Sequence, residues 1–196
     1  MSLFKTDIVK YKRYSNNKSS LILILTTQGL WALFVYRFSN KIYKSKLPTL
    51  LKKPLLVLAL MWQKWIEITT GISIPYSVNI GESFYIGHFG NIIINSNAII
   101  GDNCNISQGV TIGINGKGDN RGVPIIGDNV YIGANAVLAG KIKVGDNVVY
   151  KREKFDQAKW DALTDDDKKK PNEGKMKELH GYIQDGKTAE QIFGHL

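Results

Sequence analysis

The histidine in the stretch IGHFGNIII, residues 86–94, is the residue of this chain best suited to acid–base chemistry. His88 has Gly87 before it and Gly90 two residues after it, and the isoleucine run that follows is typical of a β-strand. Imidazole titrates near neutral pH, so a histidine at a turn can take a proton from a hydroxyl group. The glycines leave room for a substrate to approach. A surface histidine without a catalytic role is the alternative that the residues leave open.

A polar segment further along the chain is the second candidate for a site. INGKGDNRG, residues 114–122, is rich in glycine, lysine, aspartate and asparagine, which is typical of a loop. Loops on rigid scaffolds carry binding residues more often than the scaffolds do. The segment lacks the spacing of a phosphate-binding P-loop and no helical pattern follows it, so that function is not predicted.

The repeating pattern of residues 72–149 predicts the element that positions both segments. Aliphatic residues recur at intervals of six, and glycine directly follows most of them. This period predicts a β-solenoid in which each hexad forms one flat wall of a triangular coil. We expect the aliphatic residues to point inward and the glycines to turn the corners, where a positive φ is easily adopted. The inward positions are Ile74, Ile80, Ile86, Ile94, Ile100, Ile106, Ile112, Ile126, Ile132, Leu138 and Val144.

The single cysteine falls within this pattern. Cys104 has the position that Ala98 and Val110 occupy in neighbouring hexads, so we expect a small buried core residue rather than a nucleophile. One cysteine can form neither an intramolecular disulfide nor a multi-cysteine metal site. No metal is therefore predicted, and a reducing cytoplasm fits best.

The hexads, the His88 segment and two further stretches together resemble the hexapeptide-repeat acyltransferases, most closely their serine acetyltransferase branch. The two stretches are NISQGVTIG, residues 105–113, and VPIIGDNVYIGANAVLAGKI, residues 123–142. The resemblance begins near residue 65 and ends at residue 149. The basic, partly apolar leader is also similar to that of short members of this branch found in surface-polysaccharide biosynthesis.

This resemblance implies a mainly β fold, a left-handed parallel β-helix, that forms a homotrimer and binds acetyl-CoA as co-substrate between neighbouring subunits. It implies that His88 is the general base, that Gly113 lines the thioester end of acetyl-CoA and that Ala134 contacts the pantetheine arm. A backbone N–H is expected to bind the oxyanion, and Gln108 is a further candidate near the site. The loop is expected to cover the active site, with the substrate-binding candidates Asn115, Lys117, Asp119 and Arg121.

The chain departs from the serine acetyltransferase pattern at the positions that hold serine. Gly87 stands where that family has an aspartate, Val123 where it has a second histidine, and Gly122 where it has an arginine, although Arg121 is adjacent. These departures favour a hydroxyl on another acceptor, such as a sugar of a surface glycan, over free serine. A further break comes at residues 150–152, where Tyr-Lys-Arg replaces the expected aliphatic residue, glycine and alanine.

Positive charge is concentrated in residues 1–70, which hold 12 Lys or Arg against Asp7 and Glu67. These basic residues flank two apolar runs, residues 21–34 and 55–62, that are too short or too interrupted to span a bilayer. We expect three helices across residues 3–68, packed on each other and on the next domain, and contact with a membrane surface as well is left open. A nucleic-acid binder would carry this charge on its folded platform with aromatic residues interleaved, and no nucleic-acid partner is predicted.

The sequence thus divides into a basic helical segment over residues 1–70, the β-helix over residues 71–149, and an unrecognised tail with helical signals over residues 150–196. The predicted function is acetyl transfer to a hydroxyl of a small-molecule or glycan acceptor. The predicted location is the cytoplasm, at the inner face of the membrane if the leader contacts lipid. A catalytically impaired solenoid scaffold or a membrane-peripheral binding module is the alternative.

Overall fold

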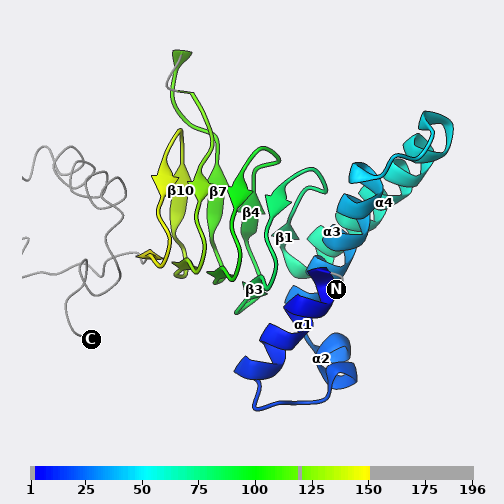
Figure 1. Cartoon of the computed structure of the whole chain (residues 1–196), viewed down its shortest axis with the longest axis horizontal. Helices are drawn as coiled ribbons and strands as arrows, with labels where there is room; N and C mark the ends of the chain where they lie inside the picture. The colour runs from blue at the N-terminus through cyan, green and yellow to red at the C-terminus, as the bar shows by residue number, and fades with distance from the viewer. Residues whose placement is uncertain (1–2, 119–120, 151–196) are drawn as a thin grey trace, which may run out of the picture.

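The computed structural model describes residues 3–118 and 121–150, and in these ranges a helical part precedes a β-helix (Figure 1). The helices are α1 (Leu3–Tyr14), α2 (Ser20–Thr26), α3 (Gln28–Lys44) and α4 (Thr49–Thr70). The prediction of three helices is therefore wrong by one. Thr27 has an extended backbone (φ −118°, ψ 106°), which separates α2 from α3. Beyond Tyr150, the tail with its predicted helices lies outside the described residues.

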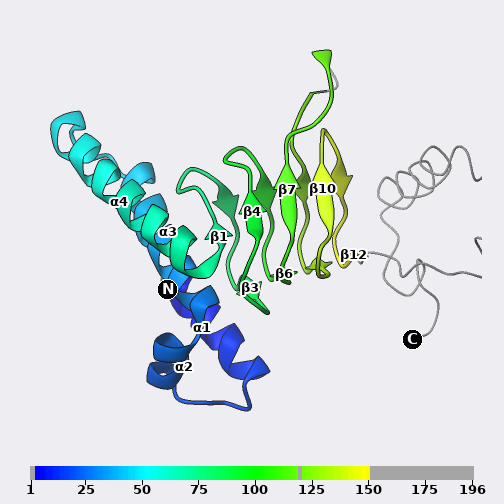
Figure 2. The same cartoon turned by 180° about the vertical axis from the view of Figure 1, so that it is seen from behind.

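The strands of the described part confirm the predicted β-helix. All strand pairs are parallel, and each coil contributes one strand to each of three sheets, in the orders β1-β4-β7-β10, β2-β5-β8-β11 and β3-β6-β9-β12 (Figure 2). The strands are β1 (Ile72–Ser73), β2 (Asn79–Ile80), β3 (Tyr85–Ile86), β4 (Ile92–Ile94), β5 (Ile99–Ile100), β6 (Asn105–Ile106), β7 (Thr111–Gly113), β8 (Ile125–Ile126), β9 (Tyr131–Ile132), β10 (Val137–Ala139), β11 (Lys143–Val144) and β12 (Val149–Tyr150).

The predicted inward residues form the core of the β-helix. Ile86, Ile106 and Ile132, for example, have the same register in successive coils, and each is almost completely buried. Cys104 is also fully buried, which confirms the prediction of a small core residue. Burial raises the pKa of its thiol to about 11. The solenoid therefore has the dry, stacked interior that its sequence period predicts.

The predicted conformation of the hexad glycines is wrong, because none of these glycines has a positive φ. At the corners between the second and third walls, the left-handed residue is instead the one two places later. These residues are Ser83, Asn103, Asn129 and Asn147. Asparagine adopts this conformation more readily than most other residues that carry a side chain.

Glycine is required at these corners by the neighbouring coil. A Cβ at Gly101 would meet the carboxylate of Asp128 and approach the carbonyl oxygen of Gly127 to 2.6 Å. The carboxylate is held there because it accepts a hydrogen bond of 2.7 Å from the backbone N–H of Asp102. The same arrangement recurs one coil earlier and one coil later, at Gly81 with Asp102 and at Gly127 with Asp146. The glycines therefore make room for a ladder of aspartates that links the coils.

The helices α1 and α3 cover the N-terminal end of the solenoid. The Tyr36 hydroxyl donates to Val78 O (2.9 Å) and accepts from the Ile80 N–H (3.2 Å), next to strand β2. The Tyr11 hydroxyl does the same for Ile86 in β3, with both distances 3.0 Å. These side chains satisfy backbone groups that the first coil would otherwise leave unpaired. The expected packing of the leader on the next domain is thus confirmed.

Candidate active site

His88 lies at an enlarged corner of the first coil, between β3 and β4. Ile86 and Ile94 are eight residues apart, whereas their register partners Ile106 and Ile112 in the next coil are six apart. The two additional residues give the first coil a wider corner, and the side chains of His88 and Phe89 are exposed there. Gly90, with a φ of +104°, helps to return the chain to β4. The exposed imidazole can therefore be reached by a substrate from solvent.

A column of residues continues below His88 on the same corner of the solenoid. Ile86, Ile106 and Ile132 are in register, and His88, Gln108 and Ala134 each come two residues after one of them, at the same corner of three successive coils. The Gln108 side-chain oxygen is buried and has no hydrogen-bond partner within residues 3–118 and 121–150. Such an oxygen can accept a hydrogen bond from an imidazole N–H or from a ligand. The candidates His88, Gln108 and Ala134 are thus gathered on one edge of the β-helix.

The predicted loop projects from the next corner of the solenoid. Gly113 ends β7, and the loop that follows is closed by a pair of backbone hydrogen bonds between Asn115 and Gly122 (3.1 and 3.0 Å). It extends well beyond the ends of the neighbouring strands in Figures 1 and 2. Its predicted binding residues Asn115, Lys117 and Arg121 are exposed, whereas Asp119 lies outside the described residues.

The two groups of predicted site residues lie on opposite edges of one sheet, the sheet β1-β4-β7-β10, here called sheet A. Its strands are parallel, so all of them begin at one edge and end at the other. His88 precedes β4 and Ala134 precedes β10, which places both at the edge where strands begin. Gly113 and the loop lie where β7 ends. The fold of one chain therefore does not bring the loop to His88.

The positions that depart from the serine acetyltransferase pattern differ in the space around them. A Cβ at Gly122 would approach the Cβ of Lys141 to 2.7 Å, so a larger residue there would require rearrangement. A Cβ at Gly87 would have only ordinary contacts, 3.5 Å from a ring carbon of Tyr85 and 3.7 Å from Ile106 O. The absence of a side chain is thus enforced by packing at Gly122 but not at Gly87.

Sequence reasoning placed His88 at a corner but missed its exposed neighbour Phe89. The signal was present in the spacing, because the eight-residue interval from Ile86 to Ile94 interrupts the period of six. Phe89 follows His88 directly in the chain and adds an apolar surface at this corner, with about half of the residue exposed. Within the described ranges, no group of three or more His, Cys, Asp or Glu residues could hold a metal ion.

Known proteins share this architecture. The family described as "Bacterial transferase hexapeptide (six repeats)" matches residues 124–149. A serine acetyltransferase of Synechococcus elongatus is 32% identical over 138 residues, which cover 70% of this chain and 53% of the relative. One of Staphylococcus epidermidis is 36% identical over 131 residues, which cover 67% and 58%.

The crystal structure of the Neisseria gonorrhoeae serine acetyltransferase superimposes with a TM-score of 0.63 and 27% identity, over 76% of this chain and 56% of that one. The fold common to both is the left-handed parallel β-helix preceded by helices. This chain spans little more than half the length of the curated relatives that it matches.

Proposed function

We propose that this hexapeptide-repeat protein, which is similar to serine acetyltransferases over about two thirds of its length, transfers an acetyl group from acetyl-CoA to a hydroxyl group. The observation that carries the proposal is the exposed His88 at the widened corner, with Gln108 and Ala134 in the coils below it. These are the positions at which the resemblance to acetyltransferases implies the general base and a contact with CoA.

The proposed reaction is a direct transfer between the two bound substrates. His88 takes the proton of the acceptor hydroxyl while the oxygen attacks the thioester carbonyl carbon. The resulting oxyanion is stabilised by backbone N–H donors at the site. The C–S bond then breaks, and the imidazolium returns its proton to the departing CoA sulfur. The products are an acetyl ester of the acceptor and free CoA.

The proposed active form is a homotrimer in which neighbouring chains complete each other's sites. Within one chain, His88 and the loop lie at opposite edges of sheet A. In a closed ring, the contact is head to tail, so the edge where strands begin in one subunit faces a different edge of the next. Acetyl-CoA would then lie between subunits, with Gly113 and Ala134 contributed by different chains.

The names of the relatives suggest L-serine as the acceptor. A specific observation favours a second candidate, a sugar hydroxyl of a glycan. Groups that bind the charged ends of an amino acid are absent at Gly87, Gly122 and Val123, and at Gly122 the contact with Lys141 leaves no space for one. A neutral sugar needs no such charged partners.

Incubation of the purified full chain with radiolabelled acetyl-CoA tests the function and separates the two acceptors. The acceptors would be L-serine, free sugars and extracted surface glycan. Label transferred to any hydroxyl supports the proposal, and a kcat/KM for serine of order 10⁴ M⁻¹s⁻¹ or more would assign serine. A folded protein that binds acetyl-CoA without transferring label to any acceptor, or that does not bind it at all, would contradict the proposal.

A further inference from the structure

Helix α4 presents an apolar face that nothing in the described part of the chain covers. Leu50, Val57, Met61, Trp65 and Ile68 recur at intervals that place them on one side of a helix with 3.6 residues per turn. Leu50 is 86% exposed and Ile68 is 83% exposed, so the face is open at both ends of the helix. The opposite side of α4, which includes the buried Ala59, packs along α3 (Figure 1).

The charge at the end of this face near the α3–α4 turn has a single sign. No aspartate or glutamate occurs between Asp7 and Glu67, whereas that interval holds 11 Lys or Arg residues. Four exposed lysines, Lys41, Lys44, Lys46 and Lys53, lie around the turn between α3 and α4. In Figures 1 and 2 this turn is the end of the helical hairpin that is farthest from the β-helix. A basic tip beside an apolar face is complementary to an anionic lipid surface.

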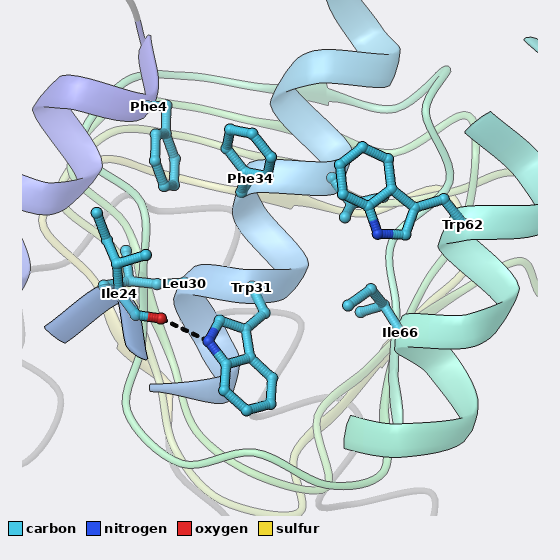
Figure 3. A pocket seen from close by; sticks show the side chains of 8 residues that line it. Phe4, Ile24, Leu30, Trp31, Phe34, Trp62 and Ile66 are labelled. Carbon is cyan, nitrogen blue, oxygen red and sulfur yellow. Dashed lines mark hydrogen bonds between the residues drawn. The ribbon is translucent and has the colours of Figure 1, made fainter. Parts of the chain in front are cut away.

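A cavity of about 310 Å³ opens between the helices, next to this face (Figure 3). All of its lining side chains are apolar or aromatic. The indole N–H of Trp31 already donates a hydrogen bond to Ile24 O at 2.6 Å. The cavity therefore offers dispersion contacts but no polar recognition, which suits a hydrocarbon chain. It is lined by Phe4, Ile24, Leu30, Trp31, Phe34, Val35, Trp62 and Ile66.

The way in which the hairpin is attached favours a position on the bilayer surface. No single described helix is long and apolar enough to cross a membrane, although α2 and α3 pass that test as a pair bent by 94°. Helix α3, however, is bound to the first coil through polar side chains. The Tyr36 hydroxyl and the Asn40 amide both donate to Val78 O. These contacts hold α3 against the β-helix, and α4 packs along α3.

We propose that the outer face of α4 and the lysines of the α3–α4 turn form a docking surface for an anionic lipid bilayer, and that the adjoining cavity takes an acyl chain from it. A two-fold contact with a second copy of this chain is the less suitable alternative, because it would place two equal basic surfaces against each other. The proposal concerns the helices alone and holds whether or not the β-helix transfers acetyl groups.

Vesicle sedimentation with the full chain tests the docking surface. The protein should pellet with vesicles that contain phosphatidylglycerol, less so at high salt, and poorly with pure phosphatidylcholine. The double variant Met61→Ser, Trp65→Ser should bind at least about tenfold more weakly, because it removes two large apolar groups. Ile99→Ser, at an exposed apolar position in β5, is the matched control and should bind like the wild type.

A charge-reversal set tests the basic tip in the same assay. A triple variant should bind the anionic vesicles more weakly; its substitutions are Lys44→Glu, Lys46→Glu and Lys53→Glu. Lys143→Glu in β11 should not weaken binding. Equal sedimentation of wild type and both helical variants would overturn the proposal. The proposal would also be overturned if the wild type did not bind vesicles and the folded M61S/W65S protein formed a smaller oligomer in light scattering. A second copy of the chain would then cover the face.

The cavity has its own test. The substitutions W62F, W65F and W160F leave Trp31 as the only tryptophan of the chain. Vesicles whose acyl chains carry bromine should quench Trp31 fluorescence strongly, since Trp31 lines the cavity. Binding of this protein without quenching would show that no acyl chain enters the cavity.

Discussion

Arg37 of α3 and Asp7 of α1 form a buried ion pair, with 2.9 Å between Nε and Oδ2. The remaining hydrogen bonds of this pair reach the solenoid. The guanidinium donates to Ile80 O (2.7 Å) and to Gly81 O (2.6 Å), and the carboxylate accepts from the Phe84 N–H (2.8 Å). The pair therefore joins two helices and the open end of the β-helix in one network.

Replacement of Asp7 by Ala should destabilise the protein strongly. It leaves the buried guanidinium without its counter-charge and Phe84 without its acceptor, and breaking such a pair costs about 3–5 kcal/mol of the free energy of unfolding. Urea denaturation measures this. Lys64→Ala is the control, because it breaks an exposed Lys64–Glu67 pair and should change stability by less than about 1 kcal/mol. Similar effects of the two substitutions would contradict the structural role of Asp7.

The two kinds of hexad glycine should respond differently to a methyl group. Gly101→Ala places a Cβ against the Asp128 carboxylate and the Gly127 backbone, so it should lower the free energy of unfolding by about 1–3 kcal/mol. Gly87→Ala meets only ordinary contacts and should cost about 0.5 kcal/mol or less. Thermal unfolding of both variants measures these changes in stability. An equal loss of stability at the two positions would contradict the packing explanation.

His88→Ala should lower kcat by roughly 10²–10⁴-fold, the usual contribution of a general base, while fold and oligomeric state are unchanged. Steady-state kinetics with the acceptor identified by label transfer measures it, with circular dichroism and light scattering as checks. His180→Ala removes an imidazole outside the predicted site and should leave kcat within about twofold. Full turnover in a folded His88→Ala protein would remove His88 from the mechanism.

Cys104 should be nearly unreactive in the folded protein. Burial raises the pKa of its thiol to about 11, so the thiolate fraction near pH 8 falls by about 100-fold relative to a thiol of ordinary pKa. The alkylation rate of the native protein should therefore keep rising up to about pH 11, whereas that of the urea-unfolded protein should level off near about pH 9. Rapid labelling of native protein at pH 8 would show that this part of the core opens.

Lys10 should make stability depend on pH. Burial of its ammonium group, which donates to Cys104 O at 3.3 Å, lowers its pKa to about 8. Between pH 8 and the ordinary lysine pKa near 10.4, the folded protein then binds fewer protons than the unfolded protein, so stability gains as the pH rises. The free energy of unfolding of wild type minus that of Lys10→Met should therefore increase through this interval. A constant difference would mean that Lys10 is not desolvated.

Much of the β-helix was predictable from the sequence. In a solenoid each coil contacts only its neighbours, so the six-residue period predicted the inward positions of Ile86, Ile106 and Ile132 and the burial of Cys104. The place of His88 at a corner followed from the same period. The sequence did not show why glycine is needed after the inward residues. At Gly101, for example, the need comes from the Asp128 carboxylate of another coil rather than from the local backbone.

The sequence by itself determines the repeating core of the β-helix, because the inward positions recur at a fixed interval of six residues. Which helix packs on the solenoid and which helix face stays exposed depend instead on long-range contacts in the folded chain. Tyr36 and Arg37 reach backbone groups of the first coil more than 40 positions away, which binds α3 to the solenoid and leaves α4 exposed. The placement of His88 and the loop at opposite edges of sheet A is likewise a property of the fold. In a parallel sheet, a segment before a strand and a segment after a strand lie at different edges, so their relation depends on sheet pairing rather than on distance along the chain.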